Sequence, residues 1–315
     1  MRYFIAGGAG FIGSSLISRI YDEENSCEVT VYDNFSSGKK EYLSGFNEKK
    51  GFVVVDSDIK DLPALKESMR GADVVYHFAS NPDISKAVKQ PDIDFWEGTY
   101  LTSNILEAMR VNGVKKLLYA SGSGVYGEVG AGRVKEDHSP MLPISTYGAS
   151  KLACEALISS YCYMFGMDAA AFRFANVVGS NQTHGVGYDF VRRLKADPSK
   201  LDILGDGSQD KSYIYISDIL KAIRLVEKQA LKGFNYYNVA TMDSITVTQI
   251  ADTVTGLMGL KNVKYVYTGG DRGWKGDVPK IYLDSEKIRR LGWKNDLDSK
   301  QAIEMSVGSM INNAR

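Results

Sequence analysis

The chain has 315 residues, of which 44% are hydrophobic and 24% are charged, and its formal net charge is zero. This is ordinary globular composition, and the length exceeds what one hydrophobic core usually fills, so we expect one large domain with a smaller companion. Balanced charge without a basic stripe argues against nucleic acid as a partner.

The cysteines and the N-terminal residues bear on metal sites and location. Cys27, Cys154 and Cys162 show no paired spacing, which argues against a disulfide framework and against a zinc site. The N-terminus lacks a signal-peptide cleavage site, and no apolar run approaches the roughly 20 residues that cross a bilayer. We therefore expect a cytoplasmic protein with no metal site and no membrane partner.

Short apolar runs rich in strand-forming residues recur through the first half of the chain. They lie at residues 2–6, 27–32, 52–56, 73–79, 115–121 and 169–175. Helical patterns lie between them, at 11–21, 61–70, 84–111 and 147–165. Strands that alternate with helices predict an α/β fold with a doubly wound parallel sheet covered on both faces.

The pattern loosens from about residue 177. Gly/Asp-rich stretches such as "GSNQTHGVG", "LGDGSQD" and "TGGDRGWKGD" separate short elements there, and such loops commonly carry binding groups. No flexible linker divides the chain. We expect residues 1–176, joined by about 213–240, to form the larger domain, and 177–212 with 241–315 to form a smaller C-terminal α/β substrate domain.

A glycine motif stands where the first strand meets the first helix. Gly8, Gly10 and Gly13 form G-x-G-x-x-G in "FIAGGAGFIGS"; glycines there let the backbone approach a pyrophosphate at a helix N-terminus. Asp33, twenty residues after Gly13, ends the second strand, where a carboxylate would bind ribose hydroxyls and repel a 2′-phosphate. This predicts a Rossmann-type domain that prefers NAD to NADP. The alternative is a glycine turn with an unrelated surface aspartate.

Tyr147 and Lys151 occur in "STYGASK". Positions i and i+4 of a helix stack on one face, so the pair can act on one small volume. By itself the spacing is weak evidence, since about two such matches are expected by chance in this composition. The alternative is two polar residues that share a helix surface.

Eight segments occur in a family order over nearly the whole chain: "GGAGFIGS", "VYDNFSSG", "DI" at 58–59, "HFA" at 77–79, "SGSGVYG", "YGASK", "RFANVVG" and "GDGSQDKSYIYISD". In these the sequence resembles the extended short-chain dehydrogenase/reductases, and within them the NAD-dependent nucleotide-sugar epimerase/dehydratase group. The resemblance implies that NAD stays bound to the first domain and that the C-terminal part holds a nucleotide diphosphate. It also implies a homodimer formed through the "YGASK" helix and the preceding long helix.

The resemblance also assigns residues to the cofactor. The implied cofactor-binding residues are Gly7, Gly8, Gly10, Phe11, Ile12, Gly13, Asp33, Asn34, Ser37, Gly38, Asp58, Ile59, Phe78, Ala79, Ser121, Tyr147 and Lys151. Asp58 and Ile59 would bracket the adenine. For these two, a solvated aspartate and a core isoleucine are the alternative.

In this group the helix that carries Tyr147 lies beside the nicotinamide ribose, which makes Tyr147 the expected base. A phenol with a pKa near 10 is a poor base at neutral pH, but Lys151⁺ and the positive nicotinamide both favour the phenolate. Lowering that pKa to about 7 needs roughly 4 kcal/mol. Tyr147 would take a proton from a sugar hydroxyl while hydride passes to the nicotinamide, giving a keto-sugar that turns over and is reduced on its other face.

The loop "SGSGVYG" departs from the group. Gly122 stands where relatives usually carry Ser or Thr, so either Ser123 supplies the hydroxyl that binds the sugar oxygen or the chain relies on Tyr147 alone. Ser123 and Gly124 also replace the Asp-Glu pair of the sugar 4,6-dehydratases, which leaves no carboxylate for elimination. Epimerisation, which needs only oxidation and reduction, is favoured.

Three residues match positions that bind the substrate diphosphate: Asn176, Lys211 and, two residues earlier than in close relatives, Arg272. Each has an alternative, a turn asparagine for the first and a solvated cation for the others. His77 and Tyr126 are expected to serve packing rather than catalysis.

The expected function is that of a cytoplasmic, homodimeric, NAD-dependent nucleotide-sugar 4-epimerase. A UDP-hexose is the expected substrate, with UDP-glucose and UDP-galactose type sugars interconverted through a 4-keto intermediate. One rival is a related enzyme for a GDP-, CDP- or dTDP-linked sugar. Another, suggested by Gly122, is a non-catalytic sensor of NAD or a sugar nucleotide.

Overall fold

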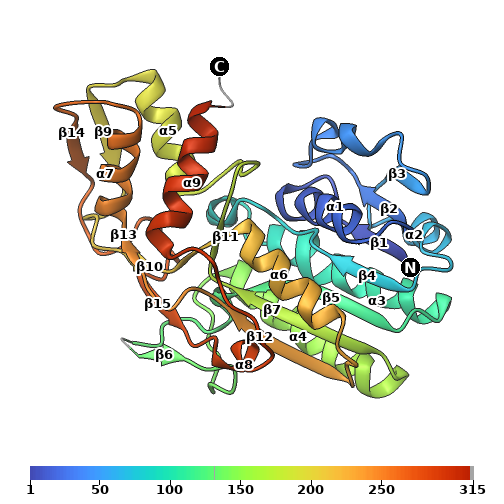
Figure 1. The fold of residues 1–315 in the computed structure, drawn as a ribbon. Coiled ribbons are helices and arrows are strands. Elements are labelled where there is room, and N and C mark those ends of the chain that lie inside the picture. The colour runs from blue at the N-terminus through green and yellow to red at the C-terminus, as the bar shows by residue number, and fades with distance from the viewer. Residues whose placement is uncertain (131, 313–315) are drawn as a thin grey trace. The chain divides into compact units, whose positions relative to one another are not determined.

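The computed structural model describes residues 1–130 and 132–312, and Figure 1 shows its elements. The chain forms two compact units. Unit 1 comprises Met1–Gly122, Thr146–Arg173 and Ile223–Tyr237, and unit 2 comprises Ser123–Ser145, Phe174–Ala222 and the residues from Asn238 onward. The polypeptide therefore passes between the units several times, as expected for a chain without a linker.

Unit 1 is built on a seven-stranded sheet in the order β12-β7-β5-β4-β1-β2-β3. Its neighbours β1–β2, β2–β3, β1–β4 and β4–β5 pair in parallel. The strands are β1 (Arg2–Ala6), β2 (Glu28–Asp33), β3 (Phe52–Asp56), β4 (Val74–His77), β5 (Lys116–Gly122), β7 (Asp168–Phe174) and β12 (Phe234–Val239). The strand order reverses between β1 and β4, and ligands of such sheets bind beyond the carboxyl ends of the strands at that point.

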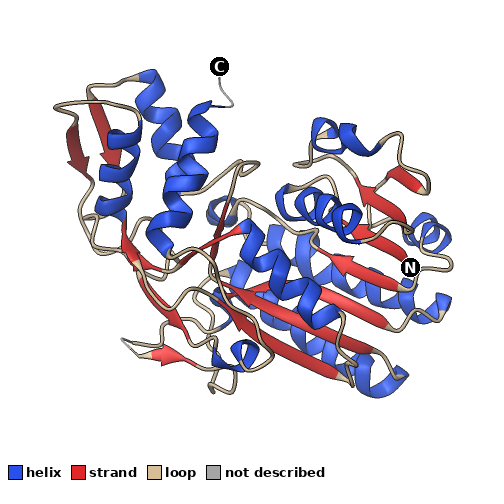
Figure 2. Cartoon of the chain, in the orientation of Figure 1, coloured by secondary structure: helices blue, strands red, loops and turns tan. Residues whose placement is uncertain are grey.

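Helices join these strands (Figure 2). They are α1 (Phe11–Glu23), η1 (Lys40–Phe46), α2 (Leu62–Ser68), η2 (Ile84–Val88), η3 (Phe95–Thr99), α3 (Tyr100–Asn112), α4 (Thr146–Phe165) and α6 (Ile216–Glu227). Hydrophobic side chains from α2, α3 and α4 pack with strand residues in one core. The predicted doubly wound, Rossmann-type α/β fold is confirmed.

One predicted element is wrong as a single helix. The pattern over 84–111 divides into a 3₁₀ turn (η2), a π-helical turn (η3) and the α-helix α3. Pro91 explains the break, because proline has no N–H to donate and disfavours helical backbone in the residue before it.

Unit 2 contains smaller sheets. Their strands are β6 (Arg133–Val134), β8 (Asn176–Val178), β9 (Lys200–Ile203), β10 (Asp210–Lys211), β11 (Tyr213–Tyr215), β13 (Ile245–Thr246), β14 (Lys264–Tyr267) and β15 (Lys280–Leu283). Its helices are the 3₁₀ helix η4 (Ser123–Val125) and the α-helices α5 (Val186–Ala196), α7 (Val247–Leu257), α8 (Glu286–Arg289) and α9 (Ser299–Asn312). Phe190, Ile250 and Ile303 bring α5, α7 and α9 into one hydrophobic core. The result is a smaller C-terminal α/β unit.

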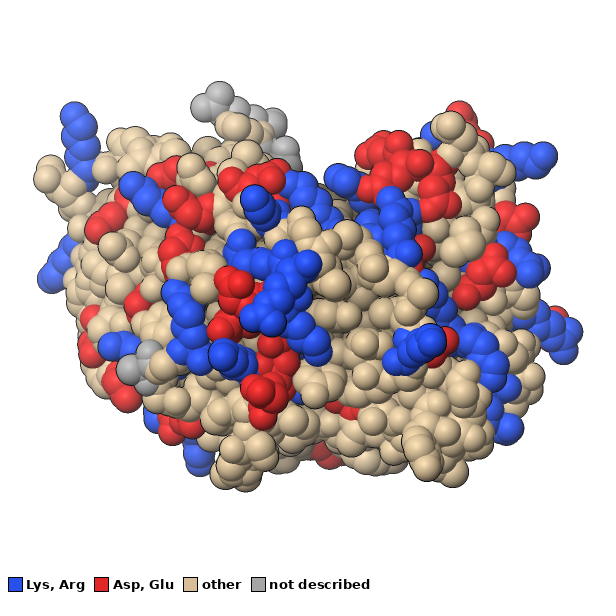
Figure 3. Space-filling view, turned by 60° about the horizontal axis from the view of Figure 1, so that its bottom comes forward, with Lys and Arg blue, Asp and Glu red and all other residues tan. Residues whose placement is uncertain are grey.

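Two further features concern the charges on the surface and the apolarity of the helices. On the face shown in Figure 3, lysine and arginine side chains alternate with aspartate and glutamate side chains, in line with the zero net charge. Within residues 1–130 and 132–312, no helix combines the length and apolarity that a membrane span requires.

Candidate active site

The glycine motif forms a tight turn between β1 and α1. Gly7 has a φ of +77°, which favours glycine, and a Cβ at Gly13 would lie 2.4 Å from the carbonyl oxygen of Gly7. Gly10 differs, because a Cβ there would have only that same oxygen within 4 Å, at 3.3 Å. Gly10 also caps α1 without a side-chain hydrogen bond, and the first helical turn, which begins with Phe11 and Ile12, has no acidic residue. The first N–H groups of α1 therefore suit an anion.

Asp33 ties this turn to the end of β2. Its Oδ2 accepts a hydrogen bond from the Ala9 N–H and its Oδ1 accepts one from the Phe35 N–H, each at 2.9 Å. The pKa of Asp33 is raised, because the effect of burial is larger than that of these two backbone donors, which lower it. Gly38 lies close by, since a Cβ there would be 2.9 Å from Asp33 Oδ1. Each carboxylate oxygen keeps a second lone pair, so the predicted ribose contacts stay chemically open.

The remaining predicted cofactor residues surround the carboxyl ends of β2, β3 and β4. Asn34 donates to Asp58 Oδ2 at 3.0 Å, and Ser37 is exposed. Ile59 is a buried member of the core of unit 1, as its alternative interpretation had it. A Cβ on Gly7 would lie 2.6 Å from the Ala79 N–H nitrogen and 3.0 Å from the carbonyl carbon of Phe78. The turn, Asp33 and the end of β4 thus meet at the switch point, where a dinucleotide fits the residues present.

Tyr147 and Lys151 lie together in the first two turns of α4. The Lys151 side chain is buried, and its Nζ donates to the carbonyl oxygen of Ala120, the third-last residue of β5, at 2.7 Å. The same Nζ lies 5.5 Å from the ring centroid of Tyr147 and 4.9 Å from that of Tyr119. Tyr147 itself is partly exposed. An ammonium therefore sits beside the phenol ring, as the helical spacing predicted.

The protein's own groups keep this phenol protonated. Desolvation by the surrounding protein raises the pKa of Tyr147 above its usual value of 10, and electrostatic interactions with Asp94 and Cys154 raise it further. Burial also lowers the pKa of Lys151 from 10.5 to about 8, against the opposing effects of Cys154, Glu155 and Asp94. We expected Lys151 to help lower the phenol pKa toward 7. In the chain without NAD, burial and Asp94 raise the phenol pKa instead, so ionisation near neutral pH would need the further positive charge of the nicotinamide.

A buried ion pair next to Lys151 was not anticipated from sequence. Glu155 lies one helical turn after Lys151, and its carboxylate accepts hydrogen bonds from Arg173 in β7, with Nη2 to Oε2 at 2.6 Å. Ser121 in β5 donates its hydroxyl to Glu155 Oε1 at 2.6 Å. The sequence signal that could have pointed to Glu155 is its spacing of eight residues from Tyr147, which places both on one side of the helix. Because the Ser121 proton is already donated, this hydroxyl is not free to donate elsewhere.

Gly122 is the last residue of β5, and Ser123 is the first residue of η4. A Cβ built on Gly122 meets no atom of the other described residues within 4 Å, its two chain neighbours apart, so its backbone has room for a side chain. Ser123 is partly exposed, and its carbonyl oxygen accepts from the Tyr126 N–H at 3.2 Å. Ser123 is the first residue of unit 2.

The predicted diphosphate residues all belong to unit 2, and two of them converge on one aspartate. Lys211 Nζ lies 2.5 Å from Asp277 Oδ1, and Arg272 Nη1 donates to the Asp277 carbonyl oxygen at 2.9 Å. Arg272 also pairs with Glu128. Asn176 Nδ2 donates to the carbonyl oxygen of Ser212 at 3.1 Å. Neither cation is simply solvated, and an incoming diphosphate would have to compete with carboxylates.

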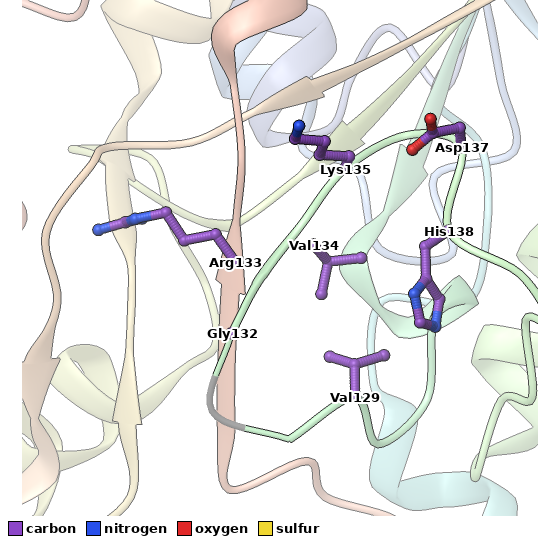
Figure 4. A pocket seen from close by; sticks show the side chains of 7 residues that line it. All are labelled: Val129, Gly132, Arg133, Val134, Lys135, Asp137 and His138. Carbon is purple, nitrogen blue, oxygen red and sulfur yellow. The ribbon is translucent and has the colours of Figure 1, made fainter.

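Unit 2 also contains a hollow that is lined by other residues. Figure 4 shows Val129, Val134 and His138 facing one another, while Arg133 and Lys135 extend away from them. None of the predicted substrate residues lines it. We therefore do not assign it to the candidate site.

Two further residues were expected to serve packing. Tyr126 is buried and donates its hydroxyl to Asn238 Oδ1 at 2.7 Å. His77 is also buried, and its Nε2 lies 3.0 Å from Thr102 Oγ1, but its Nδ1 has no hydrogen-bond partner among the residues that the structure describes. Burial and the charge of Lys151 lower the pKa of His77 to about 3. Both residues are part of the packed structure, although His77 is only half satisfied.

The glycine turn generates a first prediction. Gly10→Ala should leave thermal stability nearly unchanged, because the chain has room for the methyl group, yet weaken NAD binding on the order of tenfold, because the methyl would occupy the approach to the pyrophosphate. Gly13→Ala should lower both affinity and stability, the latter by about 1–3 kcal/mol. Calorimetric titration with NAD measures the affinity, and thermal unfolding measures the stability. Gly45→Ala, where a Cβ meets nothing within 4 Å, is the control, and equal NAD affinity in all three variants would contradict the assignment.

The buried ammonium generates a second prediction. The folded chain binds the Lys151 proton less tightly than the unfolded chain does, so the charge costs stability below pH 8, and the cost fades as pH rises toward 10.5. Lys151→Met should therefore be more stable than the parent at pH 7, by roughly 1–3 kcal/mol. The gain should shrink by pH 9.5 in urea unfolding. The exposed Lys300, replaced by Met, should show no such trend. A stability difference between Lys151→Met and the parent that is the same at both pH values would contradict the prediction.

Comparisons with known proteins agree with this geometry. A model of the NAD dependent epimerase/dehydratase family matches residues 3–240. A Methanocaldococcus jannaschii protein, named provisionally as a UDP-glucose 4-epimerase, is 34% identical over 99% of both chains. A Thermotoga maritima UDP-glucose 4-epimerase, solved with UDP-glucose, is 28% identical over 100% of both chains, with a TM-score of 0.90.

The fold is shared by an enzyme with another named reaction. A double mutant of a dTDP-glucose 4,6-dehydratase from Streptomyces venezuelae, solved with NAD, is 25% identical over 99% of this chain and 98% of its own, with a TM-score of 0.91. The family model covers about three quarters of the sequence, including the glycine turn, Asp33, Tyr147 and Lys151. The chain therefore belongs to the NAD dependent epimerase/dehydratase family, and NAD is its cofactor.

Proposed function

We propose that this protein is an isomerase, an NAD-dependent nucleotide-sugar 4-epimerase that interconverts UDP-glucose and UDP-galactose type sugars through a 4-keto intermediate. The observation that carries the proposal is the Lys151 ammonium fixed beside the Tyr147 ring at the end of β5. An acid–base pair of this kind suits the removal and return of a hydroxyl proton.

The chemistry divides between cofactor and chain. NAD, held by the glycine turn and Asp33, would supply a positive charge and a reversible hydride acceptor. Tyr147 takes the proton of the sugar 4-hydroxyl and gives it back after the keto-sugar has turned. Lys151 stays protonated and favours the phenolate, and the Ala120 carbonyl fixes where that ammonium lies. Such acid–base assistance is typically worth 10²–10⁴-fold in rate.

Epimerisation is favoured over elimination because of the residues after β5. Elimination of a 6-hydroxyl needs a positioned acid, and this chain has Ser123 and Gly124 at the relevant places. The runner-up is the same chemistry on a GDP-, CDP- or dTDP-linked sugar. A non-catalytic sensor is the second rival, and Gly122 is the observation that favours it.

We also propose the roles of the substrate residues. Asn176, Lys211 and Arg272 would bind the diphosphate, with Lys211 and Arg272 exchanging carboxylate partners for phosphate oxygens. In this scheme residues 1–176 with about 213–240 serve NAD, and 177–212 with 241–315 serve the nucleotide sugar. The enzyme would act in the cytoplasm as a homodimer.

The test is a panel of substrates. Purified protein loaded with NAD is incubated with UDP-glucose, UDP-galactose, their N-acetyl and uronate forms, and dTDP- and GDP-hexoses, and the sugars are then analysed. We expect 4-epimers of the UDP-hexoses. Tyr147→Phe, shown to retain NAD, should lose at least about 10²-fold in kcat. Turnover of no nucleotide sugar, or full activity in Tyr147→Phe, would overturn the proposal.

The loop after β5 gives a gain-of-function prediction. Gly122→Ser places a hydroxyl where a Cβ meets no atom within 4 Å, so the variant should fold normally. If a hydroxyl there binds the sugar oxygen, kcat should rise by about tenfold or less. Ser123→Ala should lower kcat in the parent and matter less in Gly122→Ser. Steady-state rates of the four combinations decide the matter, and Gly122→Ala is the control for the methylene alone.

A further inference from the structure

A buried carboxylate that the sequence analysis did not single out contacts the helix of Tyr147. Asp94 is 2% exposed and stands just before η3. Its Oδ1 accepts a hydrogen bond from Asn81 Nδ2 at 2.9 Å, and its Oδ2 accepts one from the hydroxyl of Thr146 at 2.6 Å. Thr146 is the first residue of α4. The carboxylate therefore links the loop after β4 to the N-terminus of the helix that carries the base.

The same segment holds the next turn of α4. Ser150 donates its hydroxyl to the Asp94 carbonyl oxygen at 2.7 Å and lies 2.9 Å from Thr99 Oγ1. A Cβ on Gly98 would be 2.4 Å from Ser150 Oγ, so the π-helical turn packs directly on this residue. Thr146 and Ser150 each precede a proposed acid–base residue by one position. One contact per turn thus fixes the rotation of α4 that presents Tyr147 and Lys151.

Helix geometry explains why a carboxylate is tolerated in this buried place. The N-terminus of α4 carries a partial positive charge, and two side-chain donors satisfy the Asp94 oxygens. A negative charge held there disfavours a second negative charge on the nearby phenol. Asp94 indeed raises the pKa of Tyr147.

The other titratable groups around Tyr147 come from three elements. Lys151 and Cys154 lie on α4, Tyr119 lies on β5, and His77 lies on β4, where its ring is 5.4 Å from that of Tyr119. Burial keeps the pKa of Tyr119 well above 10 and that of His77 near 3. Asp94 differs from these groups because it lies outside both α4 and the sheet, and its charge opposes formation of the phenolate.

We infer that Asp94 is a positioning residue of the reaction, which fixes the first two turns of α4 while its charge opposes ionisation of the Tyr147 phenol. This inference rests on the proposed role of Tyr147 as the base. The two effects act in opposite directions on the rate at neutral pH, because one aligns the base and the other keeps it protonated. Two substitutions separate them.

Asp94→Asn removes the charge and can keep both contacts, since its Oδ1 can accept from Asn81 while its Nδ2 donates to Thr146 Oγ1. Thr146→Val keeps the charge and removes the contact at an exposed position. The readout is the phenolate absorbance near 295 nm in NAD-loaded protein, taken as the difference between each variant and the same variant with Tyr147→Phe. It measures Tyr147 without requiring turnover.

Asp94→Asn should shift the titration midpoint of Tyr147 toward acid by on the order of one pH unit. The rising limb of kcat against pH should move with it. Thr146→Val should leave the midpoint in place and lower kcat by roughly tenfold, with little change in KM. If Asp94→Asn does not fold, the exchange Asp94→Asn with Asn81→Asp keeps a carboxylate in the pocket but moves it from position 94, which contacts α4, to position 81. Its midpoint should therefore lie on the acid side of the parent.

An unchanged midpoint in the Asp94→Asn chain, or in the exchange variant where that is used, would overturn the electrostatic half of the inference. Undiminished kcat in Thr146→Val would overturn the positional half. Failure of the proposed function looks different, because Tyr147 would then titrate as described while no nucleotide sugar is turned over.

Discussion

The candidate active site depends on one interaction, the burial of the Lys151 ammonium against the Ala120 carbonyl and the ring of Tyr147. Taking an ammonium out of water is costly, and a single hydrogen bond to a carbonyl oxygen offsets only part of the cost. Its lowered pKa reflects that imbalance. A group kept at a cost in folding free energy is a candidate for function, since such strain persists where activity requires it.

The surrounding structure fixes that ammonium from several sides. β5 supplies the Ala120 carbonyl, and Glu155, one turn further along α4, is held by Arg173 of β7 and by Ser121 of β5. Asp94 fastens the N-terminus of the same helix. The sheet places the glycine turn and Asp33 at its switch point. A parallel sheet thus orders both parts of unit 1, because the cofactor turn follows the end of β1 and the acid–base pair contacts β5 through the Ala120 carbonyl.

Local features of unit 1 could be predicted from sequence. The strands at 2–6 and 52–56 were predicted to the residue, because short apolar runs bounded by glycine or charge specify them. The glycine turn and the Tyr147–Lys151 face follow from spacings of a few residues. The prediction of one helix over 84–111 is wrong because Pro91 interrupts a segment whose apolar pattern alone favours a helix.

Partners far apart in the chain could not be predicted. Asp94 and Thr146 are 52 residues apart, and Lys211 and Asp277 are 66 apart. Periodicity says which face a residue occupies, not which distant side chain meets it. The expectation that Lys151 and the nicotinamide together favour the phenolate of Tyr147 stays a prediction. The contribution of Asp94, which raises the pKa of the phenol, could not be included in it for the same reason.

The most direct measurement is the titration of Tyr147 in the chain with and without NAD, followed by NMR of tyrosine labelled with ¹³C at Cζ and assigned by its loss in Tyr147→Phe. The account predicts a midpoint above 10 without NAD and a shift of at least about two pH units toward neutrality when NAD⁺ is bound. The same midpoint in both states would contradict it.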